Sequence, residues 1–133
     1  MVSMARATIL LVEDEAPLRN LLGRYLERQG YVVIASGDGT EALDAFTDAD
    51  GAIDVAIVDL TLPGLSGEMV VTRLLDASPS IRVIVSSGRP YSTEALPEPY
   101  RPRAEALLKP YLPQSLLDSI ARLLGDEAQP SMS

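Results

Sequence analysis

Short runs of mostly apolar residues recur along the chain, separated by segments of mixed polarity. The runs are largely continuous rather than alternating, which is typical of strands buried on both faces of a sheet. We predict five such strands, at Thr8–Val12, Tyr31–Ala35, Ile53–Leu60, Ile81–Val85 and Ala104–Leu108.

Segments with helical periodicity lie between these runs, with apolar residues three or four positions apart. Helices are predicted from Pro17 to a stop at Gly30, over Thr40–Phe46, over Glu68–Ala77 and over Pro113–Leu124, which Gly125 ends. Strands that alternate with helices predict an α/β fold with a parallel sheet, helices on both faces and right-handed crossovers.

The segment between the fourth and fifth strands has a different composition. Pro90, Pro97, Pro99 and Pro102 fall within thirteen residues, and a full-length helix cannot pass through them. We therefore predict an irregular fourth helix, with at most Ser92–Leu96 helical.

Size, charge and hydropathy limit the function classes. The 133 residues suit one domain with a hydrophobic core. We expect this domain over residues 8–125. Residues 1–7 would form an N-terminal extension, and residues 126–133 a disordered tail. The net charge of −8 argues against DNA or RNA binding. No apolar run approaches the ~20 residues that cross a bilayer, and the N-terminus lacks a signal-peptide pattern, so we expect a cytoplasmic protein without membrane contact.

Polar side chains gather where the predicted strands end. Glu13-Asp14 follows the first strand, Asp59 ends the third, Ser86-Ser87 follows the fourth, and Lys109, the only lysine of the chain, follows the fifth. Because the carboxyl ends of parallel strands meet at one edge, where ligands bind in such sheets, we expect these side chains to form one site.

The residue types at this edge favour phosphoryl chemistry. With no Cys and no His, the chain lacks thiol nucleophiles, Cys/His zinc sites and imidazole bases. Carboxylates brought together repel each other, and Mg²⁺ offsets the repulsion while keeping positions open for phosphate oxygens. We therefore predict a Mg²⁺ site at Glu13, Asp14 and Asp59, with Lys109 and Ser87 available to an anion. Asp59 is central and can act as a nucleophile that forms an acyl phosphate.

Four segments together carry a family resemblance. They are Leu10–Glu15, Val58–Gly67, Ser86–Gly88 and Leu108–Pro110. In this order and on these strands they resemble two-component response-regulator receiver domains, over about Thr8 to Leu124, either stand-alone or from a hybrid histidine kinase. The resemblance implies a flavodoxin-like (βα)5 fold with a five-stranded parallel sheet in the order 2-1-3-4-5.

The resemblance also implies roles for single residues. Asp59 matches the phosphoacceptor, Asp14 a direct metal ligand and Glu13 a ligand that acts through water. Thr61 matches the residue that lends its backbone carbonyl to the metal.

Three further positions match residues that border the phosphoryl group. Ser87 corresponds to the hydroxyl residue that follows this group, and Lys109 to the lysine that pairs with it. Arg89, together with Thr61, occupies a position that tunes the lifetime of the phosphorylated form.

The implied activity is Mg²⁺-dependent phosphorylation of Asp59 by a phosphohistidine on a histidine kinase or histidine phosphotransfer protein. Slow autodephosphorylation and a conformational switch follow, with a downstream protein effector that the sequence leaves open. Such a chain is a signalling domain that catalyses its own phosphorylation and dephosphorylation, rather than an enzyme that acts on separate substrates.

One position departs from the family pattern. Family members often carry a Tyr or Phe three residues before the lysine, and its side chain swings inward on activation. This chain has Ala106 there, which has no rotamer to switch. We therefore predict that signalling moves the Ser86–Tyr91 loop and the fourth-helix segment instead.

Three other functions use a related fold or nucleophile. An aspartyl-phosphate phosphohydrolase resembles a pattern with a second Asp two residues after the nucleophile, where this chain has Thr61. A non-phosphorylated scaffold would not need the complete set of acidic, hydroxyl and lysine residues. A flavin carrier would bind phosphate after the first strand, where Glu13-Asp14 would repel it. The receiver interpretation is favoured over all three.

Overall fold

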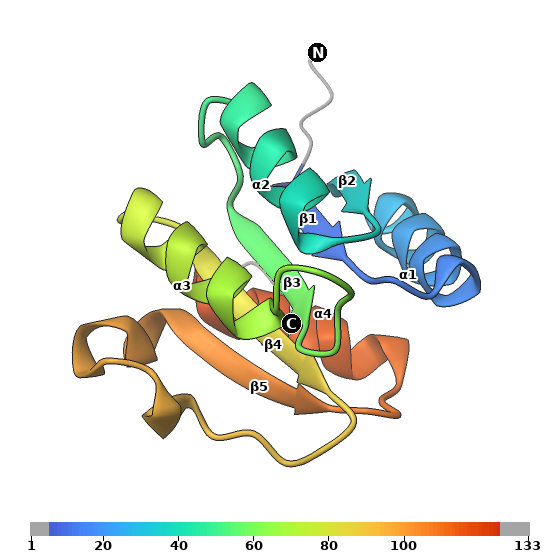
Figure 1. The fold of residues 1–133 in the computed structure, drawn as a ribbon. Helices are drawn as coiled ribbons and strands as arrows, with labels where there is room; N and C mark the ends of the chain where they lie inside the picture. Colours follow the sequence, from blue (N-terminus) through green and yellow to red (C-terminus); the bar gives the residue numbers. More distant parts are fainter. Residues whose placement is uncertain (1–5, 126–133) are drawn as a thin grey trace.

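The structure is a computed structural model that describes residues 6–125. Within them, five parallel strands form one sheet in the order β2-β1-β3-β4-β5 (Figure 1), which confirms the predicted topology. The strands are β1 (Thr8–Val12), β2 (Val32–Ser36), β3 (Val55–Asp59), β4 (Arg82–Ser87) and β5 (Ala104–Leu108). The predicted tail of residues 126–133 and most of the predicted N-terminal extension lie outside the described residues.

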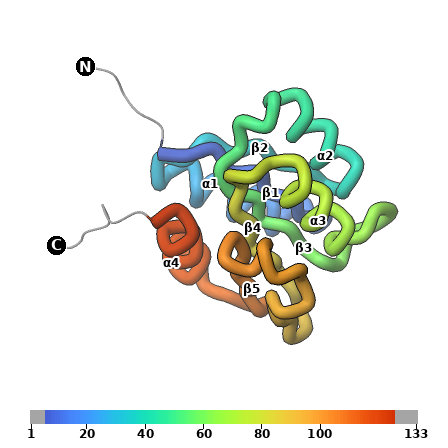
Figure 2. The backbone as a smooth tube through the Cα atoms, turned by 90° about the vertical axis from the view of Figure 1, so that its left-hand side faces the viewer, coloured from blue at the N-terminus to red at the C-terminus, as the bar shows by residue number. Residues whose placement is uncertain are grey.

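Two helices cover each face of the sheet. Figure 2 shows α1 and α4 on one side of the strands and α2 and α3 on the other. The helices are α1 (Ala16–Arg28), α2 (Gly39–Asp48), α3 (Gly67–Ala77) and α4 (Pro113–Leu124). Helix boundaries follow local capping: α2 begins at Gly39 because the Asp38 carboxylate accepts a hydrogen bond from the backbone N–H of Glu41 at 2.8 Å. No helix in the described part of the chain is long and apolar enough to cross a bilayer.

Alternate residues of the strands pack into two separate hydrophobic cores, one on each face of the sheet. On β3, Val55 and Ile57 pack with α1 and α4, whereas Ala56 and Val58 pack with α2 and α3. Successive side chains of a strand point to opposite faces, so the next residue, Asp59, points to the side of α1 and α4. The fold thus fixes the direction of each polar residue at the strand ends.

The segment between β4 and β5 is more ordered than predicted. It contains two short 3₁₀ helices, η1 (Thr93–Ala95) and η2 (Glu98–Arg103). The first lies within the predicted Ser92–Leu96, but the second was not predicted and contains Pro102. In a 3₁₀ segment this short, several backbone N–H groups do not donate within the segment. Proline, which lacks this N–H, therefore costs few hydrogen bonds there.

Candidate functional site

The carboxyl ends of β1, β3, β4 and β5 meet at one edge of the sheet, as predicted. Strand register pairs Val12 with Val58, Asp59 with Ser86, and Ser87 with Leu108. The residues that follow these strands are therefore neighbours in space, although up to 96 positions separate them in the sequence.

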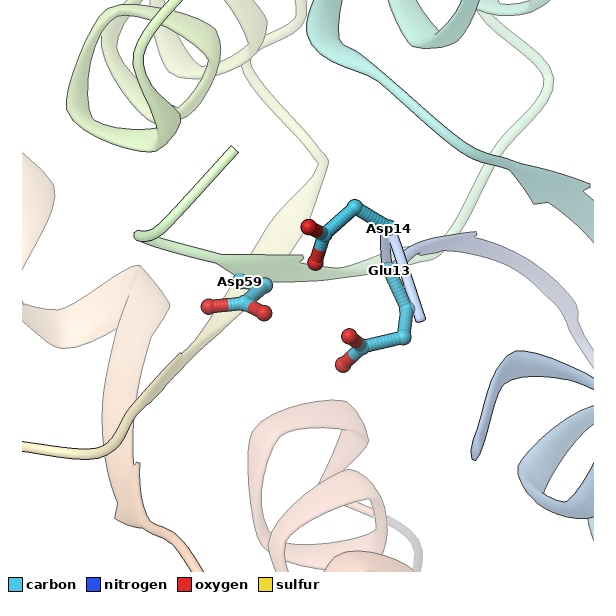
Figure 3. Close-up of side chains that lie close together, drawn as sticks. All are labelled: Glu13, Asp14 and Asp59. Carbon is cyan, nitrogen blue, oxygen red and sulfur yellow. The ribbon is translucent and has the colours of Figure 1, made fainter. Parts of the chain in front are cut away.

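Three carboxylates converge at this edge (Figure 3). Ligand oxygens of Glu13, Asp14 and Asp59 lie within 4.8 Å of one another. Glu13 is 2% exposed and Asp59 is 3% exposed, whereas Asp14 is open to solvent. Oxygen donors with one open side form a set that suits a hard divalent cation.

Lys109 joins the two buried carboxylates. Its Nζ lies 3.0 Å from Oε1 of Glu13 and 2.9 Å from Oδ2 of Asp59. Its backbone N–H donates to the carbonyl of Ser87 at 2.8 Å, which fixes the lysine beside β4. Burial alone would lower the pKa of Lys109, but the hydrogen bonds to Asp59 and Glu13 outweigh burial and hold this pKa above its ordinary value. The side chain is therefore a firmly charged ammonium.

Glu13 behaves differently from an ordinary ion-pair partner. Burial raises its pKa above 4.5, and hydrogen bonds from Lys109 and from the backbone N–H of Glu15, at 3.1 Å, only partly offset this. The negative charge of Asp59 raises the pKa further. Ionised Glu13 is thus held in the site at a free-energy cost, which a bound cation would reduce.

The loop after β3 places Asp59 and Thr61 side by side. The backbone N–H of Thr61 donates to Oδ1 of Asp59 at 2.9 Å. The loop returns close to the strand end because Gly67 begins α3 there; a Cβ at this position would collide with the backbone of Asp59 and Leu60. Ser66 caps α3 by accepting a hydrogen bond from the N–H of Met69 at 3.2 Å.

Ser87 lies on the other face of the sheet from Ser86. Its Oγ accepts a hydrogen bond from the backbone N–H of Arg89 at 3.1 Å. Thr61, Ser87, Arg89 and Tyr91 line a cavity of about 420 Å³ together with Leu60, Glu68 and Pro90. The predicted hydroxyl and tuning positions therefore share one cavity beside the acidic cluster.

Ala106 pairs with Val85 in the sheet and is exposed. Its small side chain leaves this position of β5 without an aromatic group. Movement of the Ser86–Tyr91 loop and the fourth-helix segment in signalling stays a prediction.

Comparison with known proteins decides the family. The model of the response regulator receiver domain matches residues 9–121. The chain belongs to the response regulator receiver domain family. It is thus a receiver domain of the kind found in two-component systems, as the sequence predicted.

Individual relatives agree with this assignment. The receiver domain is 30% identical over 118 residues to the sensor kinase CckA of Brucella abortus, a match that covers 89% of this chain and 12% of the kinase. The curated relatives compared with it are longer proteins, of which this chain spans 12% to 55%.

Solved structures share the fold over nearly the whole chain. A receiver domain protein from Clostridium thermocellum has 28% identity and a TM-score of 0.78, covering 92% of this chain and 97% of that one. The response regulator TrrA from Thermotoga maritima, in complex with Mg²⁺-BeF, has 27% identity and a TM-score of 0.73, covering 88% and 98%.

Two features of this receiver domain site were missed in the sequence. Arg19 falls on the polar side of the helical pattern that starts at Pro17, yet its Nη1 donates to the backbone carbonyl of Glu13 at 2.7 Å and so braces the acidic turn. Tyr111 was not among the expected site residues, but its hydroxyl is buried near the charged cluster. Its position two residues after Lys109 was the available signal.

Proposed function

We propose that this receiver domain takes a phosphoryl group on Asp59 from a phosphohistidine of a histidine kinase or histidine phosphotransfer protein. The observation that carries the proposal is the position of Asp59. It is a buried carboxylate at the centre of the strand ends, 2.9 Å from the ammonium of Lys109 and beside two further acidic residues.

The transfer is a single displacement at phosphorus. An oxygen of the Asp59 carboxylate supplies the electron pair for the new P–O bond. The P–N bond of phosphohistidine breaks, and its electron pair stays on the imidazole nitrogen of the donor. Lys109 moves its positive charge toward the phosphoryl oxygens and stabilises them during the transfer.

The acidic residues fit Mg²⁺ by their chemistry, because they supply oxygen donors with one side open to solvent. Asp14 and Asp59 would hold the ion directly, Glu13 through water, and Thr61 through its backbone carbonyl. A bound Mg²⁺ supplies charge neutralisation for the phosphoryl oxygens. Burial is the main cause of the raised pKa of Glu13, and the charge of Asp59 adds to it; a bound cation would offset both by stabilising the ionised carboxylate.

Autodephosphorylation regenerates the carboxylate. Water attacks phosphorus and gives up a proton to solvent, the P–O bond to Asp59 breaks, its electron pair returns to the carboxylate oxygen, and inorganic phosphate leaves. Thr61 and Arg89 line the cavity next to this path, which supports their proposed role in setting the lifetime. Ser87 in the same cavity would follow the phosphoryl group, and movement of the Ser86–Tyr91 loop would then take the place of an aromatic switch at Ala106.

Intact mass measurement tests the proposal. We expect incubation with phosphoramidate to add one phosphoryl group in the presence of Mg²⁺ and not in the presence of EDTA. Asp59→Asn should abolish the gain, whereas the matched control Asp54→Asn, an exposed position at the other end of β3, should keep it. Equal mass gains in Asp59→Asn and the parent would contradict the assignment of Asp59.

A further inference from the structure

The backbone carbonyl of Glu13 depends on a side chain for its hydrogen bond. Glu13 follows β1, and its own N–H donates to the carbonyl of Ser36 at 3.0 Å. The residue four positions after Glu13 is Pro17, which lacks the N–H that a helical hydrogen bond to this carbonyl would need. Among residues 6–125, the donor to this carbonyl is Nη1 of Arg19, at 2.7 Å. A guanidinium group therefore takes the place of the backbone donor at the start of the acidic turn.

The same guanidinium group contacts the loop after β2. A Cβ added to Gly37 in this loop would lie 3.2 Å from Nη1 and 3.7 Å from Cζ of Arg19. The N–H of Gly37 donates to Oε1 of Glu41 at 2.6 Å, which ties the loop to the first turn of α2. The guanidinium group of Arg19 is thus held between the acidic turn and the β2–α2 loop.

Arg19 leaves the carboxylates of the site free. Within the described part of the chain, Arg19 forms no ion pair, although Glu13, Asp14 and Glu15 precede it closely in the sequence. Its side-chain hydrogen bond goes to a neutral backbone carbonyl instead. Hydrogen bonds from a charged donor are short and strong. Arg19 therefore orients the backbone of the turn without occupying an oxygen that a metal ion would use.

Asp14 is the residue that most needs this support. Its side chain is exposed, and its carboxylate accepts no hydrogen bond from residues 6–125. The carbonyl of Glu13 belongs to the same planar peptide unit as the N–H and Cα of Asp14. A hydrogen bond that fixes this carbonyl therefore also fixes the point and direction from which the Asp14 side chain leaves the backbone.

We propose that Arg19 is a positioning residue of the Mg²⁺ site, which acts on Asp14 through the carbonyl of Glu13. The inference rests on the Mg²⁺ site of the proposed function. Removal of outer groups that orient metal ligands typically costs about 10–100-fold in metal affinity. Asp14 is one of three acidic residues here, so we expect a loss of about tenfold, at the lower end of this range.

The sign of the effect separates positioning from simple electrostatics. Loss of a positive charge near a cation site strengthens cation binding by Coulomb's law, whereas loss of ligand orientation weakens it. Arg19→Met removes the charge and the donor together, so weaker Mg²⁺ binding in this variant cannot result from the charge. Arg24→Met is the matched control, because Arg24 is an exposed residue of α1 without a hydrogen bond or ion pair to residues 6–125.

An NMR titration of backbone amides with MgCl₂ measures the Kd without a phosphodonor, at pH 7 and constant ionic strength. The Kd of Arg19→Met should be about tenfold higher than that of the parent, and the Kd of Arg24→Met equal to that of the parent or lower. Intact mass kinetics with phosphoramidate give a second readout. The half-saturating Mg²⁺ concentration of Arg19→Met should rise by the same factor, while the rate at saturating Mg²⁺ stays close to that of the parent. A general loss of structure would lower this saturated rate.

Gly37→Ala is a second variant, which displaces the guanidinium group and leaves every charge in place. The backbone of Gly37 is not in the positive-φ region, so alanine fits there apart from its contact with Arg19. This variant should also raise the Kd for Mg²⁺. It decides the question if Arg19→Met does not fold.

The remaining outcomes are also decisive. A folded Arg19→Met variant whose Kd for Mg²⁺ is equal to or below that of the parent overturns the inference. If Arg19→Met does not fold, a parent-like Kd in Gly37→Ala does the same. A parent that binds no Mg²⁺ overturns both this inference and the metal site of the proposed function. If the parent binds Mg²⁺ but gains no phosphoryl group, the proposed transfer alone fails, and the Kd values still decide the role of Arg19.

Discussion

At the scale of single residues, burial and pairing oppose each other most clearly at Glu13. Its carboxylate accepts hydrogen bonds from Lys109 and from the backbone of Glu15, but its pKa still lies above 4.5 because burial and the charge of Asp59 disfavour ionisation. Ionised Glu13 therefore lowers the free energy of unfolding of the protein in the absence of a bound cation.

We predict that Glu13→Gln is more stable than the parent at pH 7 in Mg²⁺-free buffer, by about 1 kcal/mol, a common size for a single stabilising change. Because the folded-state pKa of Glu13 is raised, the folded protein binds more protons than the unfolded chain as the pH rises above 4.5. The parent therefore loses stability with rising pH through this window, and the variant does not. The difference should disappear below pH 4.5, where Glu13 is protonated in both states.

Urea unfolding in EDTA at several pH values measures this effect. Glu94→Gln, at an exposed position, is the matched control and should show no such pH-dependent gain. A Glu13→Gln variant that is less stable than the parent at pH 7 would show that the pairing with Lys109 outweighs the burial of Glu13.

At the scale of elements, the segment between β4 and β5 is held by side chains rather than by helical hydrogen bonds. Arg103 donates to the carbonyls of Ile81 at 3.1 Å and Leu75 at 3.3 Å, and also to that of Ser78. Tyr100 in η2 bonds to Asp76 on α3. Four hydrogen bonds from two side chains thus tie η2 to the C-terminal part of α3, the turn after it and the residue before β4.

We predict that Arg103→Met lowers the free energy of unfolding by about 2–3 kcal/mol, since hydrogen bonds from charged groups contribute about 1.5–3 kcal/mol. Arg101→Met is the matched control, because Arg101 is exposed and, among residues 6–125, donates only to the nearby carbonyls of Leu96 and Glu94. Its loss should be clearly smaller in the same urea titration. Equal losses would mean that Arg103 does not anchor the segment.

The same segment shows where sequence reasoning reached its limit at this scale. Proline density correctly excluded a full helix, because that rule depends only on local backbone chemistry. The 3₁₀ helix η2 depends instead on Arg103 and Tyr100 finding partners on α3 and β4. Such partners are brought together by the whole fold, so no local pattern indicates them.

At the scale of the whole molecule, the sheet explains why so much of the site was predictable. Each buried strand could be identified from its own apolar run, and parallel strands bring their carboxyl ends to one edge. The sequence alone therefore predicts that Asp59, Glu13, Asp14 and Lys109 lie together, and the structure places them together.

Contacts that depend on side-chain direction were not predictable in the same way. Arg19 has the pattern of a solvent-facing residue but turns to the carbonyl of Glu13. The buried hydroxyls of Ser86 and Tyr111 become neighbours only through the register of β4 and the path of the chain after Lys109. Such contacts set the environment of the acidic residues and Lys109, whereas the residue types at the strand ends determine the chemistry of the site.

The most direct test of the account identifies which residue carries the phosphoryl group. The protein is phosphorylated with phosphoramidate and Mg²⁺, reduced with borohydride, which converts an aspartyl phosphate to homoserine, and digested for peptide mass spectrometry. The account predicts homoserine at position 59 and at no other aspartate of the chain. Homoserine at Asp14 instead, or a phosphoryl group on a serine, threonine or tyrosine, would contradict it.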